Sequence, residues 1–350
     1  MTIKTSTYTR LRMRLVMPGE SAKVKSQVLR SLGWFTVVVL FCLGCHSGAP
    51  FTVAVIPRTS GTGLWEPEHG GAETAALHAR AHVYWNAPTR EDDVEGQISI
   101  VNQVISKGYQ GLVLAPDQAL ALIAPVRRAV ARGIPTVIVS SPLPLPAGEK
   151  LSYILNDEET GGRIAAQRVV ELLHGHGSVA VLGVNPDITA IMIRERSLER
   201  SLALNYPQIH VIKRMGSFNF LHEQQVAEET LKANPEVRVI VGMMWASARA
   251  AMSAVEETPG FGETKVIAFD PDGGPLFDVG VLDSVIEQDT RTMGLLAVDL
   301  IDGERHGRPM PALIKLQPIL ITRQNVNTPE IQRLTSMDWR PTPWVWGTPH

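Results

Sequence analysis

The chain has 350 residues, of which 44% are apolar and 19% charged, a composition typical of a globular protein. This length exceeds what one compact core usually organises and predicts two domains. Residues 1–44 carry seven of the 33 basic residues and one of the 35 acidic residues, which leaves 26 basic and 34 acidic residues beyond them. This acidic remainder argues against nucleic acid as a partner, because nucleic-acid binding needs a basic surface.

The N-terminus has the pattern of an export signal. A basic stretch precedes the apolar run 32–43 (LGWFTVVVLFCL), which has the length of a signal-peptide core and is short for a membrane span. Leu43-Gly44-Cys45 then resembles the lipobox of bacterial lipoproteins, in which the cysteine becomes the lipidated first residue. We therefore expect a signal peptide at residues 1–44 and a tether at 45–50. An uncleaved signal anchor is the alternative, and it would also place the next domain outside the inner membrane.

From residue 51 onward, short apolar runs alternate with amphipathic stretches. The clearest unit has a strand at 111–115, a helix at 119–132 with apolar residues at three- and four-residue spacing, and a strand at 135–139. Further strands are expected at 51–56, 82–86, 151–157, 178–184, 208–214, 237–243, 264–270 and 284–289. Further helices are expected at 72–81, 93–106, 158–174, 189–205, 221–233, 246–257 and 293–301. Two successive runs of this alternation predict two similar α/β domains with parallel sheets.

Several segments carry a resemblance to a known family through their order and spacing. They are VAVIPRTSGTGLW from residue 53, GYQGLVLAPD from 108, RGIPTVIVSS from 132, YILNDEETGG from 153, VIAFD from 266 and VIEQDTRTMG from 285. Together they resemble the periplasmic sugar-binding proteins of the ribose-binding type, which share their fold with the effector domain of lactose-repressor-type regulators. The resemblance covers residues 51–327.

The resemblance implies the type I periplasmic binding protein fold, in which two Rossmann-like lobes with parallel sheets are joined by a three-strand hinge. The N-terminal lobe would comprise residues 51–155 plus 289–321, and the C-terminal lobe residues 156–288 plus 322–334. The tail at residues 335–350 has no usable periodicity, and its role stays open.

Candidate ligand contacts follow from the same resemblance, and each has a structural alternative. Asp117 matches an aspartate that accepts hydrogen bonds from ligand hydroxyls, but it could instead be the N-cap of the helix at 119–132. Trp65 matches an aromatic wall of the pocket, and the alternative is a core tryptophan. Arg194 matches the ligand-binding arginine of the family.

Polar residues at three strand ends complete the expected pocket. Asn156 at the first hinge crossing, Asp270 after VIAF and Gln288 after SVIE match further ligand contacts, with turn or cap polarity as the alternative. Carboxylates, amides and an arginine can bind adjacent sugar hydroxyls. Trp245 lies where ribose-type binders usually have an Asn-Asp pair, so it would stack on the ligand or narrow the cavity. This departure leaves open a less polar or differently substituted ligand.

Other kinds of chemistry find little support in the sequence. The histidines lack paired spacing with a carboxylate, which argues against a metal site, and no nucleophile elbow or phosphate-binding glycine pattern indicates an enzyme or a cofactor. Both cysteines, Cys42 and Cys45, fall in the export region, so we expect no disulfide in the mature chain.

The function implied by the resemblance is that of an extracytoplasmic solute-binding lipoprotein of an ABC-type importer. It would be a monomer in the periplasm, anchored to the membrane by lipidated Cys45, and it would close on a sugar or sugar-like molecule and deliver it to a membrane permease. The alternative is a sensor that presents its closed state to a membrane signalling protein. A transcription regulator is disfavoured, because an export segment occupies the place of a DNA-binding domain.

Overall fold

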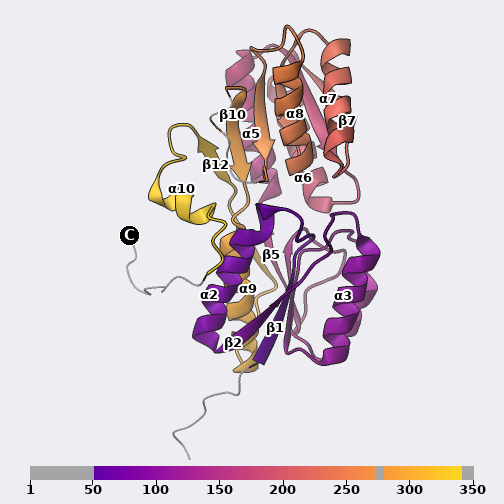
Figure 1. Cartoon of the computed structure of the whole chain (residues 1–350), viewed down its shortest axis with the longest axis vertical. Helices are drawn as coiled ribbons and strands as arrows, with labels where there is room; N and C mark the ends of the chain where they lie inside the picture. The colour runs from indigo at the N-terminus through magenta and orange to yellow at the C-terminus, as the bar shows by residue number, and fades with distance from the viewer. Residues whose placement is uncertain (1–50, 273–276, 278–279, 341–350) are drawn as a thin grey trace, which may run out of the picture. The chain divides into compact units, whose positions relative to one another are not determined.

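The computed structural model of the chain describes residues 51–272, 277 and 280–340 (Figure 1). The predicted signal peptide, the tether and Cys45 lie outside the described residues, as do the last ten residues of the tail. Within the described part of the chain, no helix is long and apolar enough to cross a bilayer.

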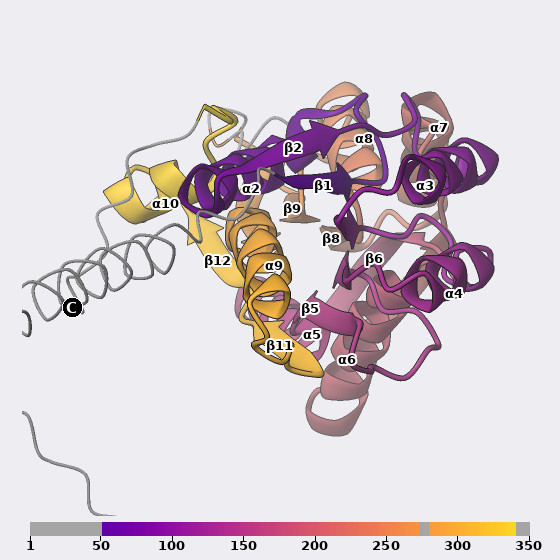
Figure 2. The ribbon, with the colours of Figure 1, turned by 90° about the horizontal axis from the view of Figure 1, so that it is seen from below.

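The first lobe is built on a fully parallel six-stranded sheet with the strand order β11-β5-β4-β3-β1-β2. Most of its strands are short apolar runs covered on both faces, as in other parallel sheets. Helices α2 and α9 pack on one face, and α3 and α4 pack on the other (Figure 2). The strands are β1 (Phe51–Ile56), β2 (Ala81–Trp85), β3 (Gly111–Leu114), β4 (Thr136–Ser140), β5 (Leu151–Asn156) and β11 (Leu313–Leu316); the helices are α2 (Glu66–Ala79), α3 (Val94–Lys107), α4 (Ile123–Ala131) and α9 (Thr290–Arg305).

The second lobe repeats this plan with the strand order β12-β10-β9-β8-β6-β7. All neighbouring strands are parallel except β12, which runs antiparallel to β10. Helices α5 and α6 cover one face, and α7 and α8 cover the other. The strands are β6 (Gly177–Val184), β7 (Ile209–Met215), β8 (Val237–Gly242), β9 (Lys265–Phe269), β10 (Leu282–Glu287) and β12 (Ile319–Thr322); the helices are α5 (Glu158–Leu173), α6 (Thr189–Asn205), α7 (Phe220–Ala233) and α8 (Trp245–Glu257). The predicted fold class, two α/β lobes with largely parallel sheets, is thus confirmed.

Three crossings join the lobes, between β5 and α5, between β10 and α9, and between β11 and β12. Helix α5 begins directly after β5, and α9 begins two residues after β10. Each helix has an aspartate N-cap: the Asp157 carboxylate accepts from the Thr160 amide at 3.2 Å, and the Asp289 carboxylate accepts from the Thr292 amide at 2.8 Å. These caps fix the direction in which the chain leaves each crossing.

The third crossing differs from the sequence-based boundary. Residues 319–321, expected in the N-terminal lobe, belong to β12 and pair with β10 in the second sheet. The apolar stretch 312–321 is in fact two strands, β11 in one lobe and β12 in the other, separated by Gln317 and Pro318. Proline has no amide hydrogen to continue a ladder, so the break falls there.

Two helix starts in the first lobe also differ from expectation. Helix α2 begins at Glu66 rather than at residue 72, with Pro67 in its first turn, and Trp65 ends a 3₁₀ turn, Gly63–Trp65, directly before it. Helix α4 begins at Ile123, and its N-cap is Leu122. Asp117 is therefore not the N-cap of this helix, which removes the structural alternative considered for it.

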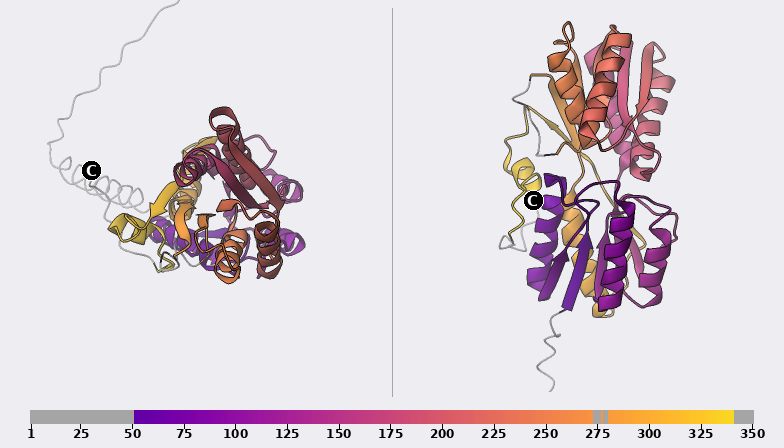
Figure 3. Two further views of the ribbon diagram at one scale, coloured as in Figure 1. Left: turned by 90° about the horizontal axis from the view of Figure 1, so that it is seen from above. Right: turned by 45° about the vertical axis from the view of Figure 1, so that its right-hand side comes forward.

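The tail makes a fourth connection between the lobes. Helix α10 (Pro329–Leu334) places Ile331 in the core of the second lobe. Residues 335–340, here named the C-terminal strap, then reach the first lobe, where the Arg291 guanidinium of α9 donates to the carbonyls of Ser336 (2.7 Å) and Asp338 (3.2 Å). Two views show α10 beside the level at which the lobes meet (Figures 1 and 3).

Stacked rings fasten the end of the strap. Trp339 lies over His69 of α2 with ring centroids 4.8 Å apart and an interplanar angle of 12°. His69 in turn stacks on Trp85 of β2 at 4.3 Å and 6°. The imidazole thus lies between two indoles, one from β2 and one from the strap. This part of the tail therefore packs against the first lobe.

Candidate ligand-binding site

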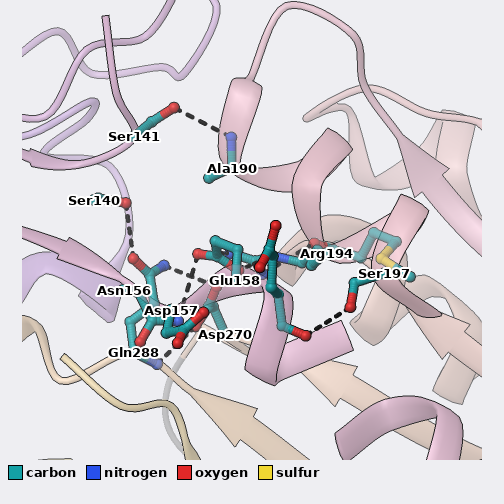
Figure 4. Close-up of polar contacts among 12 residues, drawn as sticks. Ser140, Ser141, Asn156, Asp157, Glu158, Ala190, Arg194, Ser197, Asp270 and Gln288 are labelled. Carbon is teal, nitrogen blue, oxygen red and sulfur yellow. Dashed lines mark hydrogen bonds and ion pairs between the residues drawn. The ribbon is translucent and has the colours of Figure 1, made fainter. Parts of the chain in front are cut away.

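Arg194 is the centre of a buried ion-pair network in the second lobe. It lies in the second turn of α6, which packs so closely on α5 that a Cβ on Gly162 would come within 2.3 Å of the Arg194 carbonyl oxygen. Its guanidinium forms ion pairs with Glu158 (Nε to Oε2, 2.6 Å) and Asp270 (2.8 Å) and lies 4.6 Å from the centroid of the Phe269 ring. One cation thus serves two carboxylates in a site from which water is largely excluded (Figure 4).

Burial sets the protonation behaviour of this network. Desolvation raises the pKa of Glu158 to about 7, although Arg194 acts to lower it. Desolvation also raises the pKa of Glu287, the last residue of β10, well above its usual range, and the charge of Asp270 adds to this effect. Burial lowers the pKa of Arg194, but Glu158 and Asp270 more than offset this, so it remains above its ordinary value. The arginine therefore stays charged, and the carboxylates around it are in excess.

Asp270 and Gln288 extend the network toward the first lobe. The Asp270 carboxylate accepts two hydrogen bonds from Gln288, one from the backbone N–H (3.0 Å) and one from the side-chain Nε2 (2.8 Å). The Gln288 Oε1 accepts from Ser140 Oγ at 2.7 Å, and Ser140 ends strand β4 of the first lobe. A continuous polar path therefore runs from Arg194 across the hinge to the other sheet (Figure 4).

Arg58 closes this path on the side of the first lobe. The residue follows β1 and is buried, with 6% exposure. Its Nε donates to the Pro116 carbonyl (3.2 Å), one terminal nitrogen donates to Ser140 Oγ (3.4 Å), and its guanidinium lies 5.4 Å from the centroid of the Trp65 ring. A charged side chain in the first lobe thus contacts a residue that also contacts Gln288.

Glu91 links two tryptophans that belong to different lobes. Its carboxylate accepts from Trp65 Nε1 at 3.4 Å and from Trp245 Nε1, at the start of α8, at 3.0 Å. Burial raises the pKa of Glu91 to about 7, and the positive charge of Arg58 opposes the shift. The lobes are joined further by the Gly63 amide, which donates to Asp272 at 2.7 Å, and by the Ala190 amide, which donates to Ser141 Oγ at 3.4 Å.

A small cavity, with a free volume of about 20 Å³, lies among these groups, between the two lobes. Four of the residues predicted from the sequence line it: Arg194, Trp245, Asp270 and Gln288. Arg58 and Glu91 line it as well. This volume has room for about one water molecule, so the two lobes are closed on each other in this arrangement.

A larger hollow, of about 450 Å³, lies elsewhere on the first lobe, beside Tyr109 and Pro135. These residues precede β3 and β4, so this hollow is at the amino ends of the strands. Ligands of parallel α/β sheets bind beyond the carboxyl ends. The cavity between the lobes lies beyond the carboxyl ends of the strands, and buried charged side chains line it. It is therefore the candidate site.

Comparison with known proteins decides the family. The model of the periplasmic binding protein domain matches residues 53–305. This chain belongs to that family. The D-allose-binding periplasmic protein of Escherichia coli is 22% identical over 268 residues, which are 74% of this chain and 86% of that protein. The ribose import binding protein of Bacillus subtilis is 25% identical over 64% of this chain and 72% of its own length.

Solved structures show the same architecture. An ABC transporter solute-binding protein from Agrobacterium vitis, bound to α-D-tagatopyranose, covers 81% of this chain and 98% of its own, with 25% identity and a TM-score of 0.76. A second one, from Burkholderia graminis in complex with D-arabinose, covers 79% and 97%, with 25% identity and a TM-score of 0.73. The chain therefore has the type I periplasmic binding protein fold, and it belongs with sugar-binding transport proteins rather than with enzymes.

Three predicted contacts lie behind the cavity of this binding protein. Trp65 is 1% exposed and packs in the core of the first lobe, while its indole nitrogen reaches Glu91. Asn156 donates to Glu158 Oε1 at 3.4 Å, and its own oxygen has no partner among the described residues. Asp117 lies on the Arg58 side, where burial raises its pKa and Arg58 opposes the shift. None of the three lines the cavity directly.

Two polar lining residues were not among the site residues predicted from the sequence. Arg58 stands in a loop, where an arginine is usually solvated, and Glu91 belongs to the polar segment before α3. The one sequence signal for Arg58 was its position directly after Pro57 at the carboxyl end of β1, where functional loops gather. Glu91 carried no comparable signal.

Proposed function

We propose that this chain is the solute-binding component of an ABC-type importer and that it holds a sugar or sugar-like molecule between its lobes. The observation that carries the proposal is the polar path Arg194–Asp270–Gln288–Ser140–Arg58, which borders the cavity and spans both lobes. Guanidinium, carboxylate and amide groups together offer the donors and acceptors that adjacent hydroxyls need.

Hinge closure supplies the mechanism. A ligand that contacts both lobes binds the closed state better than the open state, so it shifts the population toward closure. The contacts Trp245–Glu91 and Ser140–Gln288 belong to the closed arrangement and would break on opening. A membrane permease that recognises the closed arrangement would then accept only loaded protein, which is the partnership implied by the family.

A thermal-shift screen tests the binding proposal. The purified protein is heated with pentoses, hexoses, polyols and nucleosides, each in large excess. A ligand present at about 100 times its dissociation constant stabilises the native state by about 3 kcal/mol and raises the melting temperature. The Asp270→Asn variant should lose most of this response. A sugar that stabilises both proteins equally would show that it binds elsewhere.

The same proposal includes a lipid anchor at Cys45, supported by the sequence Leu43-Gly44-Cys45 after an apolar run. Full-length protein expressed in a bacterial host should incorporate a labelled fatty acid and fractionate with membranes. Cys45→Ser should lose both properties. Equal labelling of the two proteins would contradict lipidation at this position.

A further inference from the structure

Part of the cavity surface is apolar. The second lobe contributes an apolar wall made of Ile188, Ile191, Phe218, Met243 and Met244. Four of these side chains are buried members of the core cluster between α5, α6 and the sheet, and Phe218 packs against that cluster. The apolar wall is therefore backed by close-packed core rather than by a mobile loop.

The polar groups that line the cavity come from both lobes, Arg58 and Glu91 from the first and Arg194 and Asp270 from the second, and most of their hydrogen-bonding capacity is already used. Both Glu91 oxygens accept from indoles. The Arg194 guanidinium is committed to Glu158, Asp270 and the Met243 carbonyl. Arg58 uses Nε and one terminal nitrogen, which leaves its other terminal nitrogen without a hydrogen-bond partner among the described residues. A ligand can thus satisfy a few hydroxyls along one edge, but not hydroxyls on every side.

A hydroxyl turned toward the apolar wall would lose its hydrogen bonds to water and gain none from Ile or Met side chains. A hydrogen or a methyl group at the same place loses nothing and gains contact with the wall. We infer, on the basis of the proposed function, that the ligand is a single sugar unit that lacks a hydroxyl on one side, a deoxy or methyl-bearing monosaccharide whose apolar side lies against Ile191 and Met244. The free volume of the cavity in this arrangement is about 20 Å³, so the lobes must part to admit even one such unit, and an oligosaccharide would not fit.

Matched pairs of sugars test this inference. Binding to the full-length protein is measured by calorimetry for D-fucose and D-galactose, L-rhamnose and L-mannose, L-fucose and L-galactose, and 2-deoxy-D-ribose and D-ribose. In the pair that binds most tightly, the deoxy sugar should have a dissociation constant at least tenfold lower than its hydroxylated partner. Equal or tighter binding of the hydroxylated partner would overturn the inference but leave the proposed function standing. No binding by any pair, or by the wider sugar panel, would count against both.

Wall variants identify the source of the preference. Ile191→Thr and Ile191→Val give side chains of the same shape that differ by one hydroxyl, and Met244→Gln and Met244→Leu form a second polar and apolar pair. At one or both positions, the polar variant should reduce the preference for the deoxy sugar severalfold relative to its apolar counterpart. If both polar variants keep the same preference as their counterparts, the apolar wall does not select the ligand, and the inference is wrong. Each comparison is between two folded variants, confirmed by their melting curves, so a general loss of structure cannot imitate the result.

Discussion

Ser140 and Asp270 share an uncommon backbone conformation. Ser140, the last residue of β4, has φ 64°, and Asp270, directly after β9, has φ 46°, so both non-glycine residues lie in the left-handed region. Such conformations cost energy and are concentrated at functional sites. Here each turns a polar side chain toward the polar path between the lobes, since Ser140 donates to Gln288, and Gln288 donates to Asp270. The strained backbone at each strand end thus directs a side chain to Gln288 in the candidate site.

The Arg194 ion pairs predict a large difference between two arginines on one helix. Arg194→Met should lower the free energy of unfolding by about 3–5 kcal/mol, because it leaves Glu158 and Asp270 buried without their cation. Arg196→Met is the matched control, because Arg196 is an exposed residue of the same helix. Urea denaturation of both variants measures the difference. Similar losses in the two would show that the buried ion pairs contribute little.

Glu68 predicts how stability depends on pH. It is 1% exposed, neither carboxylate oxygen has a hydrogen-bond partner among the described residues, and burial raises its pKa from 4.5 to about 8 while Arg58 acts to lower it. Between these values the native state holds a proton that the unfolded state releases. The contribution of Glu68 to the free energy of unfolding is therefore greatest below pH 4.5. It falls by roughly 1 kcal/mol per pH unit as the pH rises to about 8.

Glu68→Gln should flatten this dependence, because the amide does not titrate. The free energy of unfolding is measured by denaturation at intervals from pH 4.5 to 8.5. Glu263→Gln, at an exposed position of the second lobe, should retain the wild-type slope. Equal slopes in all three proteins would mean that Glu68 does not titrate in this range.

At the scale of the elements, the C-terminal strap connects the two lobes in addition to the three crossings of the hinge. Trp339→Ala should lower the free energy of unfolding by about 1 kcal/mol, since it removes one ring of the stack on His69. Trp339→Phe keeps an aromatic ring and should lose less. Denaturation of both variants measures the effect. If alanine and phenylalanine behave alike, the stack does not hold the strap.

The elements that the sequence predicted best are those with strong local patterns. The residues of α6 match the expected helix because its apolar positions repeat at helical spacing. Strand β1 matches because it is a short run of five apolar residues and one threonine between two breaks. The early start of α2 was missed because its first turns, EPEHGG, are polar and rich in glycine. The division of 312–321 between two lobes depends on partners distant in sequence, which no local pattern reveals.

The candidate ligand contacts also divide into those that a local sequence pattern indicates and those that depend on residues distant in the sequence. Arg194, Asp270 and Gln288 stand at strand and helix ends whose position follows from the alternation of elements, and these three line the cavity. Glu91 acts through Trp245, 154 positions away in the chain. Such a pairing is set by tertiary packing, so the sequence alone could not have indicated it.

For the whole molecule, the contact between Glu91 and Trp245 predicts a shift in the balance of open and closed states. Trp245→Phe keeps an aromatic ring but removes the indole N–H that donates to Glu91. Loss of one hydrogen bond to a carboxylate, about 1–3 kcal/mol, should raise the open fraction and weaken the apparent ligand affinity. Small-angle scattering and calorimetry measure these effects. Unchanged scattering and affinity would contradict a role for this bond in closure.

The carboxylate of Glu91 holds one indole from each half of the protein. Indole emission responds to hydrogen bonding and to nearby charge, so parting the halves should change the light emitted by both Trp65 and Trp245. The protein would then report its own opening and closing through native fluorescence, in real time and without an attached dye. Rapid mixing with a ligand could follow how fast the halves come together.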